Sequence, residues 1–289
     1  MKSQVLHAGF SLIELIVVIV LLGLLAGGAG LLILNPIEAY EAQVRRQQLV
    51  DQGEMALRQI ARDLHRALPN SVRIAPAGAG FALEMVNIVD GARYRDEYGG
   101  AYLADPDFVL DFTGPDAVFN LLGRLNNPAV FNPNNRLVIY NTSTNIYAEA
   151  VDVDKQGIIT DAGTTLAFAT LNPGPNQEDQ ISLSTAFEFT QQSPGQRAFL
   201  VDSAISYICN PATSEILRYS GYGFDDPQQI PPGGVGVVSD TLVSQVIGCN
   251  ASYTPGTAQR GGIITFDITL GDSGENITLL HQVHVVNVP

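Results

Sequence analysis

The pattern of hydrophobic and polar positions divides the chain into an apolar N-terminal segment and a long part with short alternating runs. Residues 15–34 contain no charged side chain. About 20 uncharged, mostly aliphatic residues are the length that an α-helix needs to cross a bilayer. We therefore predict a transmembrane helix over residues 15–34.

The apolar segment is followed by a stretch with helical periodicity, residues 37–68. Leu57, Ile60, Leu64 and Leu68 recur at steps of three and four residues, which places them on one face of a helix. We expect an amphipathic helix that lays this face on the rest of the protein.

Two prolines are expected to mark the course of this helix. Pro36 lacks the N–H that a helix interior requires, so it should kink or interrupt the helix. Pro69 disfavours helical backbone at the residue before it. The sequence thus predicts an N-terminal helix over residues 10–68, with a bend near Pro36.

A row of arginines lies beside the apolar face of the predicted helix. Arg58, Arg62 and Arg66 are four residues apart, and Glu54 stands one turn before Arg58, which favours an ion pair. The row fits either contact with acids on a partner or a solvated helix face.

From residue 71 onward the hydrophobic period changes from that of a helix to that of strands. Short alternating runs are separated by clusters of Pro, Gly, Asn and Asp. We predict a β-rich head over residues 69–289, and hence an α+β protein. Residues 210–214 and 271–276 have the composition of hairpin turns. The runs expected to form strands are residues 81–89, 107–112, 117–123, 136–141, 181–190, 197–210, 215–222, 262–270 and 277–288.

The charge balance argues against nucleic acid as a partner. The formal net charge is −14, and the part from residue 74 onward holds 23 acids against 8 Lys and Arg. Such a surface repels phosphate backbones.

The chain has two cysteines, Cys209 and Cys249. Both follow the apolar segment, so export would place them in an oxidising compartment, where a disulfide is favoured. The loop closed by that bond would be worth roughly 4 kcal/mol in the chain-entropy treatment. The alternative is two unpaired buried thiols.

An acid, Glu14, stands at the start of the apolar segment. A cleaved secretory signal would account for the small residues within 24–30, and a plain membrane anchor would account for the length of the run. Neither accounts for a carboxylate in apolar surroundings, which costs about 3 kcal/mol at mid-membrane on insertion scales. The acid therefore indicates a more specific kind of segment.

Residues 9–14, GFSLIE, followed by the apolar run, resemble the leader of type IV prepilins and type II secretion pseudopilins. The resemblance implies a leader peptide over residues 1–9, cleavage between Gly9 and Phe10 by a prepilin peptidase, and N-methylation of the new Phe10 amine. It also implies that Glu14 pairs with the Phe10 amine of a neighbouring subunit. In a low dielectric such a pair is strong, and an unpaired carboxylate is costly.

The resemblance implies a pilin-like fold. It also extends to one subgroup of the pilin-like proteins. Residues 58–74, 201–224 and 279–289 are similar to the minor prepilin-like biogenesis proteins of the mannose-sensitive haemagglutinin (MSHA) pilus, relatives of the J-type minor pseudopilins. The implied role is that of a minor pilin in pilus assembly or initiation. The alternatives are a J-type minor pseudopilin of a type II secretion system and a tip adhesin.

The same resemblance implies where the protein acts and with what. It would be a single-pass protein of the bacterial inner membrane with its head in the periplasm, and later part of a pilus at the cell surface. Its partners would be the prepilin peptidase, other major and minor pilin subunits, the inner-membrane assembly platform and the lipid bilayer.

Catalysis and cofactors are not expected. Residues 271–274, GDSG, resemble the nucleophile loop of chymotrypsin-like proteases but lack the residues that continue that motif and a histidine in the required order. The candidates for a bound Ca²⁺ are Asp152, Asp154 and Asp161, with an acidic hairpin as the alternative. Gly163 stands where an EF-hand loop needs a bidentate Glu.

Overall fold

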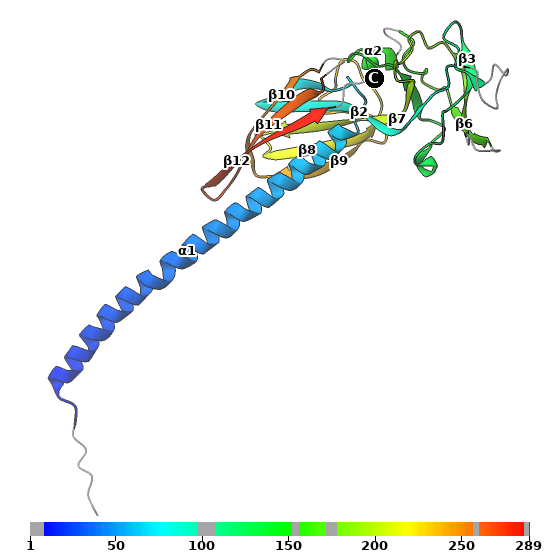
Figure 1. Cartoon of the computed structure of the whole chain (residues 1–289). Helices are drawn as coiled ribbons and strands as arrows, with labels where there is room; N and C mark the ends of the chain where they lie inside the picture. The colour runs from blue at the N-terminus through cyan, green and yellow to red at the C-terminus, as the bar shows by residue number, and fades with distance from the viewer. Residues whose placement is uncertain (1–8, 98–107, 152–155, 172–177, 257–259, 286–288) are drawn as a thin grey trace, which may run out of the picture.

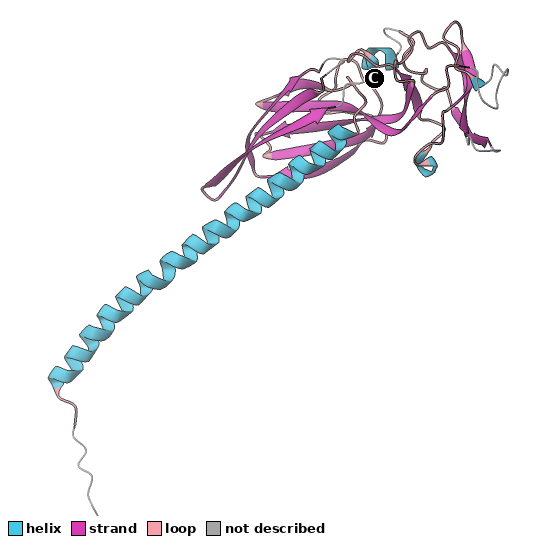
Figure 2. Cartoon of the chain, in the orientation of Figure 1, coloured by secondary structure: helices cyan, strands magenta, loops and turns pink. Residues whose placement is uncertain are grey.

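A single long helix leads into a head made almost entirely of strands (Figures 1 and 2). The computed structural model describes residues 9–97, 108–151, 156–171, 178–256, 260–285 and 289, with the side chains of residues 29–38 and 171 left out. The architecture is the α+β, pilin-like fold that the sequence predicts.

The helix α1 (Leu12–His65) is 54 residues long, which is about 80 Å at 1.5 Å per residue. It runs through Pro36 without interruption, so of the two predicted outcomes at this proline, a kink or a break, the break does not occur. A proline removes one backbone hydrogen bond, and a helix can accommodate that loss by bending. Figure 1 shows α1 as a gently curved, continuous helix.

The helix ends at His65, three residues before the predicted end at Leu68. The N–H groups of Arg66 and Ala67 donate to Asp63 and Leu64, which tightens the last turn. The N–H of Leu68 then donates to the carbonyl of Val86 at 2.9 Å. The chain leaves the helix because the neighbouring strand supplies this next partner.

The head contains twelve described strands, all paired antiparallel, in three sheets. The six-stranded sheet has the order β1-β2-β7-β8-β9, with β4 also paired to β7, and the others are β10-β11-β12 and β3-β6-β5. The strands are β1 (Arg73–Ala77), β2 (Gly80–Arg93), β3 (Asp116–Asn120), β4 (Arg136–Ile139), β5 (Leu166–Leu171), β6 (Glu178–Phe187), β7 (Arg197–Asn210), β8 (Glu215–Tyr222), β9 (Val238–Ser244), β10 (Val246–Thr254), β11 (Gly262–Asp272) and β12 (Glu275–Val285). The short helices are η2 (Pro128–Val130), a 3-10 turn, and α2 (Ile146–Ala150).

The largest hydrophobic core joins the C-terminal half of α1 to two of the sheets. Leu57, Ile60 and Leu64 from α1 are buried in one cluster with residues of β2 and β7 from the six-stranded sheet and of β10, β11 and β12 from the second sheet. The helix therefore forms one wall of this core, which we call the proximal core. The apolar face predicted from helical spacing is the face that packs.

A second core lies in the distal part of the head, away from α1 (Figure 1). It holds Phe119, Ile181 and Phe189 together with Leu200 of β7. Since β7 contributes residues to both cores, this strand connects the proximal and distal parts of the head.

The predicted strand at residues 107–112 is wrong over its described part. Residues 108–112 form no strand; instead the N–H of Leu110 donates to the carbonyl of Arg95 at 2.9 Å, and the Leu110 side chain is buried in the distal core. The apolar side chain of Leu110 thus packs into the core from a loop and not from a strand. Strands β1, β5, β9 and β10 were not predicted.

Within the part of the chain that the structure describes, no helix is both long and apolar enough to cross a membrane. The last residues of the predicted transmembrane segment, 29–34, have side chains outside the described set. A bilayer-spanning role for residues 15–34 therefore stays a prediction.

Candidate functional site

The N-terminus of α1 is built by the residues that the prepilin resemblance singles out. Ser11 is the N-cap, and its hydroxyl oxygen accepts from the N–H of Glu14 at 3.2 Å. The Glu14 carboxylate in turn accepts from the N–H of Ser11 at 3.3 Å. This reciprocal pair is a capping box, which satisfies two of the N–H groups that a helix start leaves free. Glu14 thus has a structural role within its own chain.

Gly9 and Phe10 lie just before the cap, outside the helix and exposed. Phe10 is 83% exposed, and a Cβ at Gly9 would meet nothing within 4 Å. The bond between them is therefore accessible. Cleavage and methylation here, and pairing of Phe10 with Glu14 of another subunit, stay predictions.

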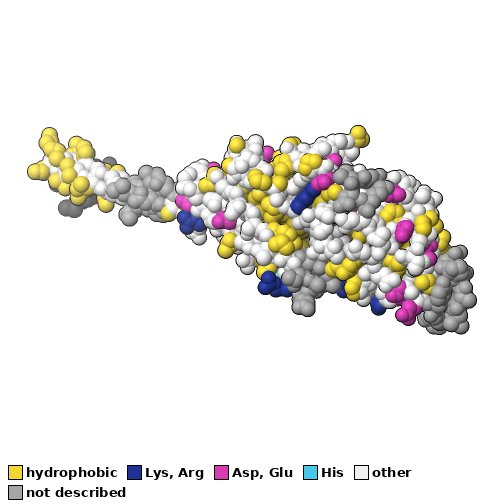
Figure 3. Space-filling model, turned by 90° about the horizontal axis from the view of Figure 1, so that it is seen from above, with side chains coloured by type: hydrophobic (Ala, Val, Ile, Leu, Met, Phe, Trp, Pro, Cys, Tyr) yellow, Lys and Arg dark blue, Asp and Glu magenta, His cyan; other side chains and the backbone are white. Residues whose placement is uncertain are grey.

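The free end of α1 is hydrophobic on every side. The described large aliphatic residues from Leu12 to Leu25 are all exposed, and Figure 3 shows this end of the helix covered by hydrophobic side chains. An aliphatic surface of this extent on a helix is typical of contact with lipid or with other apolar helices.

The second half of α1 is fixed to the head along its length. Arg46 forms an ion pair with Glu275 of β12 at 2.8 Å. A Cβ at Gly53 would lie 2.3 Å from the Leu279 side chain, so the helix and β12 approach closely at this glycine. The contact between helix and head begins near residue 46.

A buried polar cluster fixes the last turns of α1. The Asp63 carboxylate accepts from the hydroxyl of Tyr207 at 2.6 Å and from the Nε of Arg218 at 2.9 Å. Burial, reinforced by the Asp63 charge, raises the pKa of Tyr207, so the phenol stays a donor. For Arg218, burial opposes the charge, but the hydrogen bond and charge of Asp63 outweigh it and raise the pKa. The cluster ties α1 to β7 and β8.

The arginine row faces solvent. Arg58, Arg62 and Arg66 are exposed, and Arg58 forms the predicted ion pair with Glu54 at 2.7 Å. Arg62 donates to Gln59 on the same helix. The row is a solvated helix face, and a contact with a partner's acids is an untested prediction.

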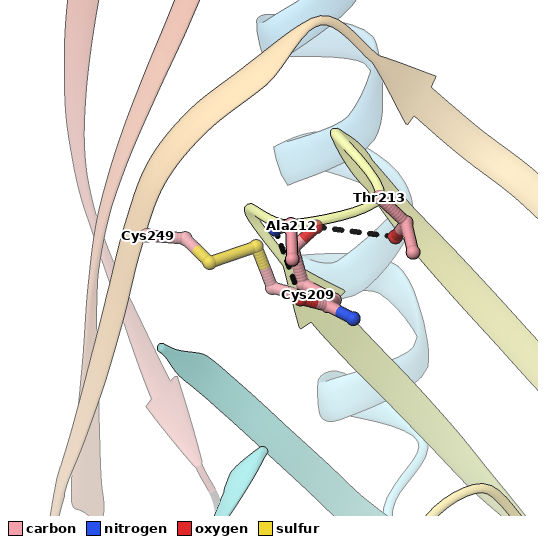
Figure 4. Close-up of a disulfide and its surroundings, with 5 residues drawn as sticks. Cys209, Ala212, Thr213 and Cys249 are labelled. Carbon is pink, nitrogen blue, oxygen red and sulfur yellow. Dashed lines mark hydrogen bonds between the residues drawn. A yellow bond between two sulfur atoms is a disulfide. The ribbon is translucent and has the colours of Figure 1, made fainter. Parts of the chain in front are cut away.

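Cys209 and Cys249 form the predicted disulfide (Figure 4). Cys209 belongs to β7 and Cys249 to β10, so the bond joins the six-stranded sheet to the β10-β11-β12 sheet. It lies beside the turn after β7, where Asn210 accepts from the N–H of Ala212 and from the hydroxyl of Thr213. The bond therefore links the two sheets that enclose the proximal core covalently.

The predicted calcium candidates are only partly described. Asp152 and Asp154 lie outside the described residues, while Asp161 lines a cavity together with Glu149 and Glu188. Among the residues that the structure describes, no group of three His, Cys, Asp or Glu side chains could hold a metal ion.

Three features were missed in the sequence. The Ser11–Glu14 capping box has a local signal, since Ser-x-x-Glu before an apolar run is typical of a helix start. Asp63 had a weaker signal, an acid on the apolar side of an amphipathic helix. Glu149 had none, because its partners come from a loop without a recognisable motif.

The comparisons with known proteins agree with the geometry of this helix start. No curated protein and no solved structure matches the chain. Residues 6–30 match the family described as prokaryotic N-terminal methylation motif, and this range covers the predicted cleavage position, the capping box and the exposed apolar part of α1. The chain therefore carries the N-terminal methylation motif of type IV pilin-like proteins.

Proposed function

We propose that this protein is a minor pilin-like subunit that is cut after Gly9, methylated on the Phe10 amine and assembled into a type IV pilus. The observation that carries the proposal is the continuity of the methylation motif, residues 6–30, with a helix whose described aliphatic residues are exposed up to Leu25. Such a helix needs apolar surroundings, and a bilayer followed by a filament core would supply them. The role is structural, without catalysis.

The proposed assembly mechanism uses charge at one end of this helix. Cleavage creates a cationic amine on Phe10, and Glu14 of an adjacent subunit supplies the carboxylate. Between packed apolar helices the pair would be only weakly screened, so it would favour one register of neighbouring subunits. The apolar run, residues 15–34, would hold the subunit in the inner membrane before assembly.

Within the pilin-like proteins we propose a subunit like MshO, of the MSHA pilus. The support is the sequence likeness in residues 58–74 and 201–224, which in the structure form the buried end of α1 and the β7–β8 hairpin. A J-type minor pseudopilin would share the same leader chemistry.

The leader proposal is tested with a Gly9→Leu variant, expressed with its cognate peptidase and analysed by intact mass and N-terminal sequencing. Wild type should lose residues 1–9 and gain one methyl group on Phe10, whereas the variant should stay uncut. A mature N-terminus at Phe10 in the variant would rule the proposal out.

The pairing mechanism is tested by comparing two changes at Glu14. Glu14→Gln keeps a capping-box residue but removes the charge, while Glu14→Ala removes both. If charge pairing guides assembly, both variants insert in the membrane but assemble poorly. Normal assembly of the Gln variant alone would assign Glu14 a capping role only. Glu41→Ala, an acid on α1 outside the motif, is the control.

A further inference from the structure

Helix α1 contacts an edge strand of each of two sheets. Strand β9 ends the six-stranded sheet, and β12 ends the β10-β11-β12 sheet. A groove lies between α1 and β9, and a second groove lies between α1 and β12. The backbone N–H and C=O groups of a helix interior are used within the helix, so α1 cannot pair with either edge as a further strand would.

The groove beside β9 has a volume of about 400 Å³. Strand β9 pairs with β8, and among the described residues no hydrogen bond reaches its other side. The backbone groups on that side are therefore available to an added strand. Residues 241–244 of β9 line the groove. The lining residues from α1 are Gln52, Met55, Ala56, Gln59 and Arg62.

The helix side of this groove offers an apolar contact. Met55 is 62% exposed, although it stands between residues that pack on the head. Successive side chains of a strand point to opposite faces of the sheet, so an added strand would present every second side chain to α1. Apolar side chains on that face would cover Met55.

The charge of this groove is opposite to that of the chain as a whole. Its lining holds Arg62 and no acid, whereas the chain has a formal net charge of −14. Arg62 donates to Gln59 and forms no ion pair with any described residue. Strand β9 carries Asp240, but this acid lies outside the lining and stands opposite Arg218 in the pairing with β8. An exposed guanidinium in such a groove favours a carboxylate from a partner.

The groove beside β12 does not show this preference. Its lining includes Glu54 and Arg58, which form an ion pair with each other at 2.7 Å. Because these two charges are already paired, the groove beside β12 has no unpaired cation to select an acidic segment.

We propose that the groove between α1 and β9 binds an extended segment of a partner protein, which adds a strand to β9 and places an acidic side chain at Arg62. The free edge of β9 requires an extended occupant, and Arg62 selects one that carries a carboxylate. The proposal does not depend on the pilus assignment, because none of its residues belongs to the methylation motif at residues 6–30.

The test is fluorescence polarisation of the full-length protein in detergent with a labelled peptide, Thr-Val-Thr-Glu-Thr-Val-Thr, whose Val and Glu side chains share one face of a strand. The peptide should bind saturably. A matched peptide with Lys in place of Glu should bind at least about tenfold more weakly, because the carboxylate that pairs with Arg62 is replaced by a cation.

Two further peptides test whether binding is strand addition. One carries N-methyl groups on its Val and Glu residues, and the other carries them on its inner Thr residues. Alternate residues of a strand direct their N–H groups to the same edge, so the methyl groups block the bonds to β9 in only one of the two peptides. Only that peptide should lose binding. Loss in both peptides, or in neither, would overturn the proposal.

Variants locate the binding. Arg62→Gln should weaken the Glu peptide about tenfold, whereas Arg66→Gln, which removes an arginine outside the groove, should change it less than about twofold. Both arginines are exposed, so both variants should fold. Absence of saturable binding, equal affinity for the Glu and Lys peptides, or equal effects of the two variants would contradict the proposal. Self-association that Arg62→Gln abolishes, without peptide binding, would identify a second copy of the chain as the occupant and would also overturn it.

Discussion

Gly80 is a residue at which the close approach of a neighbouring strand requires a glycine. It begins β2 and lies against the Cys209–Cys249 disulfide. A Cβ at this position would stand 2.1 Å from the Cys209 carbonyl oxygen and 2.9 Å from the Cys249 sulfur. Because the nearest atom is backbone, the neighbours cannot give way by a side-chain rotation, and a glycine is required.

We expect Gly80→Ala to lower the free energy of unfolding by about 1–3 kcal/mol, the usual cost of overpacking a core. The measurement is urea unfolding of the full-length protein in detergent. Gly114→Ala is the matched control, since its Cβ would meet nothing within 4 Å. An equal loss in both variants would mean that the close approach at Gly80 does not exist in solution.

The burial of Glu149 has a consequence for the pH dependence of stability. Burial raises the pKa of the Glu149 carboxyl above its ordinary value of 4.5, although backbone N–H groups of Ile158 and Ile159 oppose the shift. The folded protein therefore holds this proton more tightly than the unfolded chain. The stabilising contribution is complete below about pH 4.5 and is lost as the pH rises through the folded-state pKa.

The predicted readout is the difference in unfolding free energy between wild type and Glu149→Gln, measured by urea unfolding from pH 4 to pH 7. Because Gln does not titrate, wild type should lose stability relative to the variant as the pH rises. A difference that is constant, or that grows in favour of wild type, would contradict the raised pKa.

At the scale of elements, the junction between α1 and the sheet depends on a few polar contacts within an apolar seam. Asp63 receives hydrogen bonds from Tyr207 and Arg218, and its side chain is largely buried. Removing the carboxylate leaves the Arg218 guanidinium and the Tyr207 phenol without this acceptor. A buried polar group that loses its partner lowers the free energy of unfolding by more than the hydrogen bond itself contributed.

Asp63→Ala should therefore destabilise the protein by about 3 kcal/mol, the lower end of the range of roughly 3–5 kcal/mol for a broken buried pair, because Arg218 is partly exposed. Hydrogen exchange should also speed up in the last turns of α1 before it does in the distal head. Glu54→Ala breaks the exposed pair with Arg58 and should cost less than about 1 kcal/mol. Similar losses in both variants would contradict a special role for Asp63.

The elements differ in how well they could be predicted, for a physical reason. Strands β7 and β8 were predicted with their observed bounds, since their apolar runs are long and flank a clear turn at residues 210–214. Strand β9 was missed because most of its residues are exposed and so carry no hydrophobic period. The helix over residues 10–68 was predicted close to its observed bounds, but the sequence left open whether Pro36 interrupts it, because the local effect of a proline does not include the helical residues on both sides.

The residues of the candidate site also differ in how well the sequence predicts them. The motif at Gly9, Phe10 and Glu14 is contiguous, so the sequence alone identifies it. The Asp63–Arg218 contact joins residues 155 positions apart, and the Glu149 cavity is closed by the end of β6. Such sites arise from tertiary packing, which periodicity and local motifs do not report.

At the scale of the whole molecule, α1 has two separate tasks. Its described residues up to Leu25 expose their aliphatic side chains, whereas Leu49 and the residues that follow it on the same seam are buried against the head. The first ion pair between helix and head is that of Arg46 with Glu275. The stability of the head should therefore be independent of the first half of the helix.

This division predicts the behaviour of a chain that begins at Tyr40. It keeps every described contact between α1 and the head, so its unfolding free energy should lie within about 1 kcal/mol of the full-length value. Without detergent it should stay monomeric, while the full-length chain should associate through its exposed aliphatic surface. Urea unfolding and light scattering after gel filtration measure the two properties.

A chain that begins at Gln52 is the matched comparison. It loses Arg46 and the buried Leu49, which is 2% exposed, and burial of one such side chain is worth about 1.5–3 kcal/mol. The shorter chain should therefore be less stable than the one that begins at Tyr40 by at least that amount. If the two are equally stable, the contact that stabilises the head begins later than residue 51. If the Tyr40 chain aggregates or unfolds, the head needs the first half of α1 to fold.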